Sequence, residues 1–250
     1  GVFVDDAFNR RFNSSLNLSY GFSDKKFKQD FSAGYLLGDY RTWQIKFRAF
    51  NKLKILFEES DNYGELFSTL VSLISKDEFR DYYYSKGFEL GIEGEVLPVL
   101  KLRLGFKNKT DNSAFVNTDF SFFNKDKSYR INPPIYETRI NTLKLGFDID
   151  FRDYIEDGYF RRRTSLGRSY ILFSGDITYS NMGLFNSGLN FTTYEFSTRA
   201  FLRTFKSASL NLNLYARVND GTTPYQDLYS LPGNIDVVFN SQTFRTLNIN

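Results

Sequence analysis

Apolar and polar residues alternate along most of this 250-residue chain, and most regularly between residues 89 and 107. In residues 89–96 and again in residues 100–107, nearly every second residue is apolar and those between are charged or glycine. Successive side chains of a β-strand point to opposite faces, so each stretch predicts a strand with one apolar and one charged face. The short Leu97-Pro98-Val99 segment between them predicts a hairpin turn.

The charged face of this hairpin carries opposite charges on its two strands. The predicted cross-strand pairs are Glu95 with Lys101, Glu93 with Arg103, and Glu89 with Lys107. Lys46 and Arg48 lie on the corresponding face of another predicted strand, residues 41–50. We predict that these eight residues form a charge ladder lining a wet interior, because ion pairs cost little where water reaches them and much in a dry core.

The same period of two recurs along the chain, and one segment breaks it. The predicted strands are residues 14–22, 27–37, 41–50, 89–96, 100–107, 141–152, 169–179, 190–202 and 209–218, with another beginning at 243–250. In residues 64–76 the spacing is helical instead. Its apolar positions are Leu66, Phe67, Leu70, Val71 and Ile74, which predict a short amphipathic helix in a long loop. A helix packed on a soluble core is the alternative.

Repeated strands of this kind predict an all-β fold, an antiparallel transmembrane β-barrel. Strands of about nine to eleven residues suit a membrane crossing, and the aromatic content of 18% suits the lipid face and its aromatic girdles. The connections after the second, fourth and eighth predicted strands are short and those after the third, fifth and ninth are long, as in outer-membrane barrels. The connection around Arg161 is longer than this pattern requires. We predict one barrel domain over residues 1–250, with about ten strands visible, as part of a larger barrel and truncated at both ends.

Composition excludes several chemistries. The net charge of +3 gives no reason to expect nucleic-acid binding. The chain has no Cys and no His, which removes thiolate and imidazole chemistry. Asp148 and Asp150 lack the spacing of a calcium loop, and the glutamates of the ladder face basic residues rather than forming a hydrolytic pair. We therefore predict no enzyme activity, no cofactor and no metal. We interpret the three arginines at residues 161–163 as a solvated turn rather than a site for anionic lipid head groups or a partner.

Two short segments resemble a known family. Residues 223–234 (TPYQDLYSLPGN), followed by residues 244–248 (FRTLN), resemble the end of the large outer-membrane barrels of Bacteroidetes that carry a carboxypeptidase-regulatory-like N-terminal domain. Residues 81–84 (DYYY) after a helical loop are similar to that family too. The family in turn looks like a distant relative of the BamA/TamA superfamily. This resemblance implies that Leu231-Pro232-Gly233 corresponds to the turn that precedes an arginine loop in that superfamily. It implies that Arg245 corresponds to the arginine of this loop, which reaches into the lumen there.

The resemblance implies a non-enzymatic barrel in the bacterial outer membrane that assists the assembly or translocation of outer-membrane components. Its expected partners are outer-membrane lipid and other outer-membrane or periplasmic proteins. Two alternatives remain open from the residues alone. The first is a passive pore whose lumen charges set selectivity. The second is a soluble, aromatic-rich β-sandwich binding protein, which would bury Ile92, Leu102, Leu104 and Phe106 under a second sheet.

Overall fold

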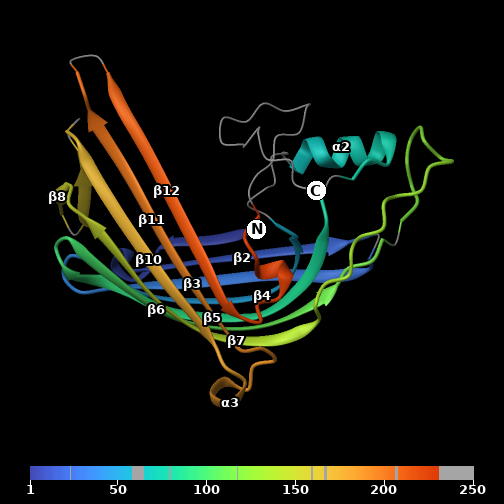
Figure 1. The fold of residues 1–250 in the computed structure, drawn as a ribbon, viewed down its shortest axis with the longest axis horizontal. Coiled ribbons are helices and arrows are strands. Elements are labelled where there is room, and N and C mark those ends of the chain that lie inside the picture. The colour runs from blue at the N-terminus through green and yellow to red at the C-terminus, as the bar shows by residue number, and fades with distance from the viewer. Residues whose placement is uncertain are drawn as a thin grey trace.

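The fold is dominated by one long antiparallel sheet that curves strongly (Figure 1). The computed structural model describes residues 1–22, 24–57, 65–78, 80–116, 118–158, 160–165, 168–205 and 208–230. Ten strands form the sheet in the order β1-β2-β3-β4-β5-β6-β7-β10-β11-β12. Each strand therefore lies beside its neighbours in sequence, apart from the insertion between β7 and β10.

The strands follow the alternating segments of the sequence. They are β1 (Val2–Asp6), β2 (Phe12–Gly21), β3 (Lys26–Leu37), β4 (Trp43–Ile55), β5 (Tyr82–Leu97), β6 (Leu100–Ser113), β7 (Thr138–Asp150), β10 (Tyr170–Ser180), β11 (Phe191–Arg203) and β12 (Ser209–Gly221). Nine of them are the nine predicted between residues 14 and 218, several extended by a few residues. β1 was not predicted, and the strand predicted at residues 243–250 lies outside the described residues.

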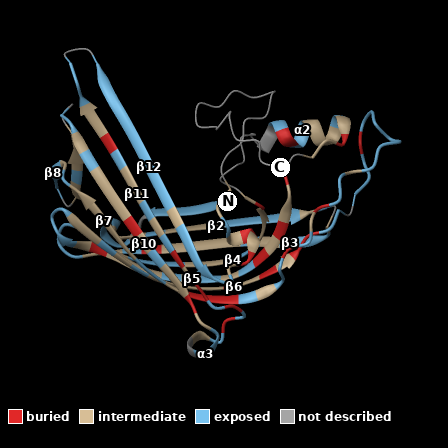
Figure 2. Ribbon diagram, in the orientation of Figure 1, coloured by how far each residue is buried: buried red, intermediate tan, exposed pale blue. Residues whose placement is uncertain are grey.

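The sheet is open in the described part of the chain. β1 and β12 are its two edges, and no pairing joins them there. The two edges differ, because β1 pairs with β2 through three residues, whereas β12 pairs with β11 along thirteen. β12 is exposed along almost its whole length (Figure 2). An antiparallel ten-stranded sheet is thus established, and its closure into a barrel is not.

The described helices are short and none of them is part of the sheet. They are α1 (Ala7–Arg10), α2 (Glu65–Ser75), α3 (Met182–Phe185) and the 3₁₀ turn η2 (Tyr225–Asp227). α2 confirms the helix predicted from the spacing of residues 64–76. None of the helices in the described ranges is long and apolar enough to cross a membrane.

At the end of the sheet with the long connections, α2 packs against the loop between β6 and β7. The carbonyl of Leu73 accepts a hydrogen bond from the N–H of Phe122 at 2.9 Å. The Lys76 ammonium, which is buried, binds Asp119 at 2.8 Å. Nearby, Leu56, Tyr83 and Ile135 form a small apolar cluster. The long loops are therefore tied to each other and to the strand ends.

A second, two-stranded sheet occupies the connection between β7 and β10. It consists of β8 (Asp153–Asp157) and β9 (Phe160–Thr164). Gly158 adopts a φ of +61°, which glycine reaches without steric cost. The prediction of a plain solvated turn at residues 161–163 is therefore wrong in its local structure, since these residues belong to a β-hairpin.

A charged concave face as the candidate functional site

The concave face of the sheet is charged because the alternation of β5 and β6 directs their ionisable residues to that side. The register places Glu95 opposite Lys101, Glu93 opposite Arg103, and Glu89 opposite Lys107. These are the three pairings predicted from the sequence, and the register confirms them. The 3₁₀ turn η2 lies inside the curve (Figure 1), and its Asp227 binds Lys109 of β6, which identifies the charged side as the concave one.

Opposite residues on neighbouring strands do not all bind each other. Glu89 and Lys107 do, at 2.8 Å. Glu93 instead binds Lys101 at 2.5 Å and Lys46 of β4 at 2.8 Å. The carboxylate therefore joins three strands, β4, β5 and β6, on one face.

The Arg103 side chain points away from Glu93, towards β7 and β10. Its guanidinium binds Asp148 on β7 and Asp176 on β10, the latter at 3.0 Å. It also donates to the hydroxyl of Ser174 at 3.1 Å. Arg103 therefore joins β6, β7 and β10 on the concave face.

Arg48, another predicted member of the ladder, binds a carboxylate that the sequence did not single out. Its Nε and Nη2 donate to the two oxygens of Asp30 on β3, at 2.8 and 2.5 Å. Lys52 binds the same carboxylate at 2.9 Å. The alternation of β3 was visible in the sequence, but which of two flanking strands would supply the partner was not.

The Glu95 carboxylate forms no ion pair with Lys101 or with any other residue of the β5–β6 hairpin. Its two oxygens accept from Arg161 and Arg163 of β9, each at 3.2 Å. The Arg161 guanidinium also lies over the rings of Tyr154 and Tyr40, 4.4 and 5.0 Å from their centroids. Only Arg162 of the three arginines projects into solvent, with 71% of its side chain exposed. The β8–β9 hairpin is therefore attached to the turn end of the large sheet.

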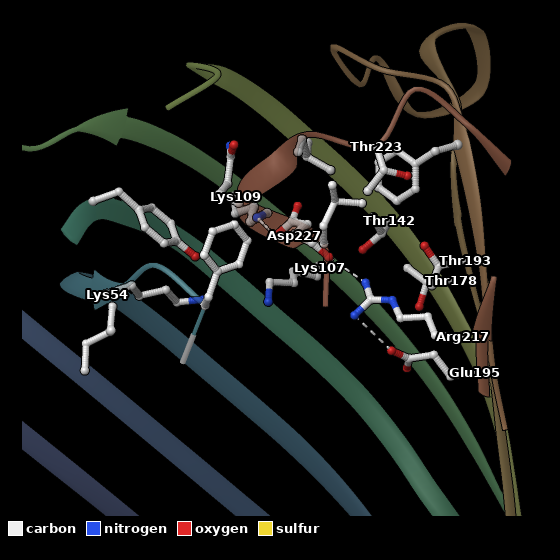
Figure 3. Close-up of a pocket in the computed structure, with 17 residues that line it drawn as sticks. Lys54, Lys107, Lys109, Thr142, Thr178, Thr193, Glu195, Arg217, Thr223 and Asp227 are labelled. Atoms are coloured by element: carbon white, nitrogen blue, oxygen red, sulfur yellow. Dashed lines mark hydrogen bonds and ion pairs between the residues drawn. The ribbon is translucent and has the colours of Figure 1, made fainter. Parts of the chain in front are cut away.

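The segment after β12 folds back into the curve. Asp227 binds Lys109 at 2.6 Å, and Arg217 of β12 donates to the Asp227 carbonyl at 2.6 Å. Lys109 also binds Asp111 at 2.6 Å, and both side chains are buried. Between this segment and the sheet lies a cavity of about 270 Å³ (Figure 3). Sequence reasoning missed it, because Lys109 and Asp227 are 118 residues apart.

The convex face is apolar and uncovered in the described part of the chain. Leu90, Leu102 and Leu104 are 50%, 42% and 45% exposed. Trp43, the single tryptophan, packs over Gly94, where a Cβ atom would lie 2.1 Å from the indole. The absence of a side chain at Gly94 is therefore what allows the indole to lie flat against this face.

Tyr225 and Asp24 are two of the groups outside the strands whose pKa values are shifted. Burial raises the pKa of Tyr225 in η2, and the charge of Asp81 raises it further. At the turn between β2 and β3, burial acts to raise the pKa of Asp24, but hydrogen bonds from Lys28, Tyr84 and the Lys26 backbone outweigh it and the pKa is lowered. Both groups therefore keep at neutral pH the charge state that ordinary Tyr and Asp have.

No group of three or more acidic residues that could hold a metal ion occurs among the described residues. Asp148 and Asp150 bind Arg103 and Arg152. The segment Leu231-Pro232-Gly233 and Arg245, which the resemblance singled out, lie outside the described residues.

The fold and the two faces of its main sheet together define a class of protein. Its members have a long, strongly curved antiparallel sheet with a charged, ion-paired concave face and an apolar, exposed convex face. Comparison with protein families matches residues 3–249 to the C-terminal domain of DUF5686, a family of unknown function. The chain belongs to this family. Searches of curated proteins and of solved structures gave no match.

Proposed function

We propose that this sheet is the wall of a transmembrane β-barrel in the bacterial outer membrane, with lipid against its convex face. The observation that carries the proposal is the exposure of that face. Leucines on this face of β5, β6 and β7 (Leu90, Leu104 and Leu145) are 50%, 45% and 51% exposed. Outward apolar side chains alternating with inward polar ones are the signature of a barrel wall.

The ion pairs of the concave face also support the proposal. Its ion pairs keep partial contact with solvent, as at Glu89 and Lys107, whose side chains are 35% and 33% exposed. Such pairs are stable in a water-filled interior, where desolvation is incomplete. In a bilayer the free edges of β1 and β12 must also be paired, because lipid offers no hydrogen-bond partner to backbone groups. The proposal thus includes closure through pairings beyond those described.

Within that membrane we propose a non-enzymatic role in the assembly or translocation of outer-membrane components, with outer-membrane or periplasmic proteins as partners. Two features favour this role over an open pore. The β8–β9 hairpin and η2 both occupy the inside of the curve or its rim, and the edge strand β1 is held by only three residue pairs. The unpaired N–H and C=O groups at a sheet edge can pair with an incoming strand, and the few residue pairs between β1 and β2 make this edge the easier one to open. The resemblance to the Bacteroidetes barrels, and through them to the BamA/TamA superfamily, points the same way.

A passive pore is the second candidate, and the size of the free space on the concave face favours it. Cavities of about 690 and 830 Å³ follow this face, lined among others by Lys46, Glu93 and Lys101. A soluble sandwich is disfavoured, since in the described part no second sheet covers Leu102 or Leu104.

Trp43 provides the test of the membrane proposal, because it is the single tryptophan and lies on the convex face. The protein is reconstituted into vesicles whose acyl chains carry bromine, a short-range quencher of indole fluorescence. We expect strong quenching by brominated acyl chains and weak quenching by aqueous iodide. Strong iodide quenching together with a monomeric protein in detergent-free buffer would contradict the proposal.

Conductance across planar bilayers separates the two candidate roles. A pore gives steady, open-channel currents whose ion preference changes when lumen charges such as Glu93 are neutralised. An assembly-type barrel whose interior is obstructed gives small or transient currents. Steady large currents would therefore favour the pore and overturn the assembly role, while leaving the membrane location intact.

A further inference from the structure

The helix α2 exposes apolar side chains and covers polar ones. Leu70 and Ile74 are 57% and 47% exposed, and Phe67, which belongs to the same stripe, is exposed too. Residues three, four and seven apart share one face of an α-helix. On another side of the helix Ser68 is buried, and its hydroxyl donates to Glu78 at 3.2 Å. A helix on the surface of a water-soluble protein has the reverse arrangement.

The β6–β7 loop adds aromatic side chains beside α2. Phe120, Phe122 and Phe123 are exposed, and the rings of the first two meet edge to face with centroids 5.2 Å apart. The Ser121 hydroxyl donates to the carbonyl of Leu73 at 3.0 Å, which fixes this part of the loop against the helix. We call the six exposed side chains the α2 apolar surface: Phe67, Leu70, Ile74, Phe120, Phe122 and Phe123.

The helix lies at the strand ends, clear of the sheet (Figure 1), and on the convex side of β4 and β5. A cavity of about 280 Å³ is lined by Ser72 of α2 together with Leu53, Tyr82 and Tyr84. Leu53 pairs with Tyr84, and the alternation of β5 puts both of them, and Tyr82, on the convex face. Residues two apart point to nearly opposite sides of a helix. Ser72 therefore faces these strands, and Leu70 faces away from them.

We propose that the α2 apolar surface inserts into the interfacial region of the bilayer and anchors the long connections beside the barrel wall. This inference rests on the proposed membrane location. If lipid covers the convex face, a helix on that side of the strand ends meets the bilayer surface. Phe, Leu and Ile side chains bury favourably at the boundary between headgroups and acyl chains. Lipid is favoured over a second copy of the chain, because the surface adjoins the face that lipid is proposed to cover.

Tryptophan fluorescence tests this inference once the single indole is moved from the wall to the helix. In a Trp43→Phe background, Leu70→Trp places the indole on the α2 apolar surface, and Asp126→Trp places it at an exposed position of the same loop, between two lysines. Each protein is reconstituted into vesicles whose acyl chains carry bromine near the headgroup. We expect bromine to quench Leu70→Trp about twofold or more strongly than Asp126→Trp, and aqueous iodide to show the opposite order. Because α2 contains no Lys or Arg, quenching should be equal in neutral and anionic vesicles.

The unsubstituted protein, with its indole at Trp43, separates this inference from the proposed function. Bromine quenching of Trp43 together with iodide quenching of Leu70→Trp would overturn the anchor and leave the membrane location intact. Protection of the Leu70→Trp indole from both quenchers would also overturn the anchor, because protein, such as a second copy of the chain, would then cover this surface. Absence of bromine quenching at both positions would overturn the anchor and the membrane location together. Retention of the β-sheet circular dichroism in both variants excludes misfolding as the cause.

Discussion

The two faces of β5 and β6 differ in which side chains they expose. Apolar side chains are the more exposed ones on the convex face, and charged side chains are largely covered on the concave face. On the convex face Leu90 and Leu104 are 50% and 45% exposed, while on the concave face the side chains of Glu93 and Arg103 are 17% and 23% exposed. Soluble proteins place most charged groups outside and most leucines inside. The comparison teaches that the outer surface of this sheet is suited to an apolar medium, and that its polar groups meet each other across the inside of the curve.

The largest expected effect comes from placing a charge on the convex face. Leu104→Arg should prevent stable insertion into lipid vesicles, at a cost of about 2–4 kcal/mol if the position lies near the middle of the bilayer. Gly105→Arg is the matched control, because the neighbouring residue faces the concave side and a Cβ there meets nothing closer than 3.8 Å. Folding yield into vesicles is the measurement. Equal losses in both variants would contradict the assignment of the two faces.

The next effect sharpens the comparison on the concave side. Arg103→Met leaves Asp148 and Asp176 without their shared guanidinium, and should lower the free energy of unfolding by about 1–3 kcal/mol. Lys101→Met should cost less than about 1 kcal/mol, because Glu93 retains Lys46. Denaturant-induced unfolding in detergent measures both. A larger loss at Lys101 would show that the network is not organised around Arg103.

A smaller, local effect is expected at the rim between the two faces. Glu95→Gln removes the charge that holds Arg161 and Arg163, so the β8–β9 hairpin should open more often. Amide hydrogen exchange over residues 153–164 should accelerate, while global stability changes by no more than about 0.5 kcal/mol.

Glu156→Gln is the control for that experiment, since Glu156 is more exposed and binds Arg161 at the longer distance of 3.5 Å. It should change exchange much less. Unchanged exchange in Glu95→Gln would mean that the aromatic contacts of Arg161 hold the hairpin without the carboxylate.

The smallest expected effect is a pH dependence outside the strands. The pKa of Asp24 is lowered in the folded protein, so its contribution to stability is complete above the unfolded pKa of about 3.9 and is lost as the pH falls through the lower folded value. Asp24→Asn should therefore reduce stability at pH 7 by at most about 1 kcal/mol and make the acid limb of the stability curve shallower. Unfolding midpoints between pH 2 and 7 measure it, and an unchanged acid limb would exclude this role for Asp24.

Much of the sheet could be predicted from the sequence, because a period of two over eight or more residues determines both the strand and its faces. The register of β5 against β6 followed in the same way from the short turn at residues 97–99. β1 was missed because five residues are too few for the period to stand out. The β8–β9 hairpin was not predicted, although the dipeptide Asp157-Gly158 is a typical hairpin signal. The three arginines after it were interpreted as a solvated turn.

The ion pairs were less predictable than the register. A residue in a sheet has a neighbour on each side, so Glu93 could bind along β6 or across to β4, and it binds both. Which partner an arginine reaches depends on strand twist and side-chain length, which alternation does not encode. The cavity under η2 could not be predicted at all, because it depends on a contact between segments far apart in the sequence.

The strand order has a consequence for how the chain folds. Nearly every pairing joins strands adjacent in sequence, so each new hairpin closes only a short loop, and formation of the sheet carries a low entropic cost per step. The contacts of η2, such as the ion pair between Lys109 and Asp227, are an exception, because they can form only after β12 has formed. We therefore expect the sheet to zip up hairpin by hairpin, with closure of η2 over the concave face as the final step.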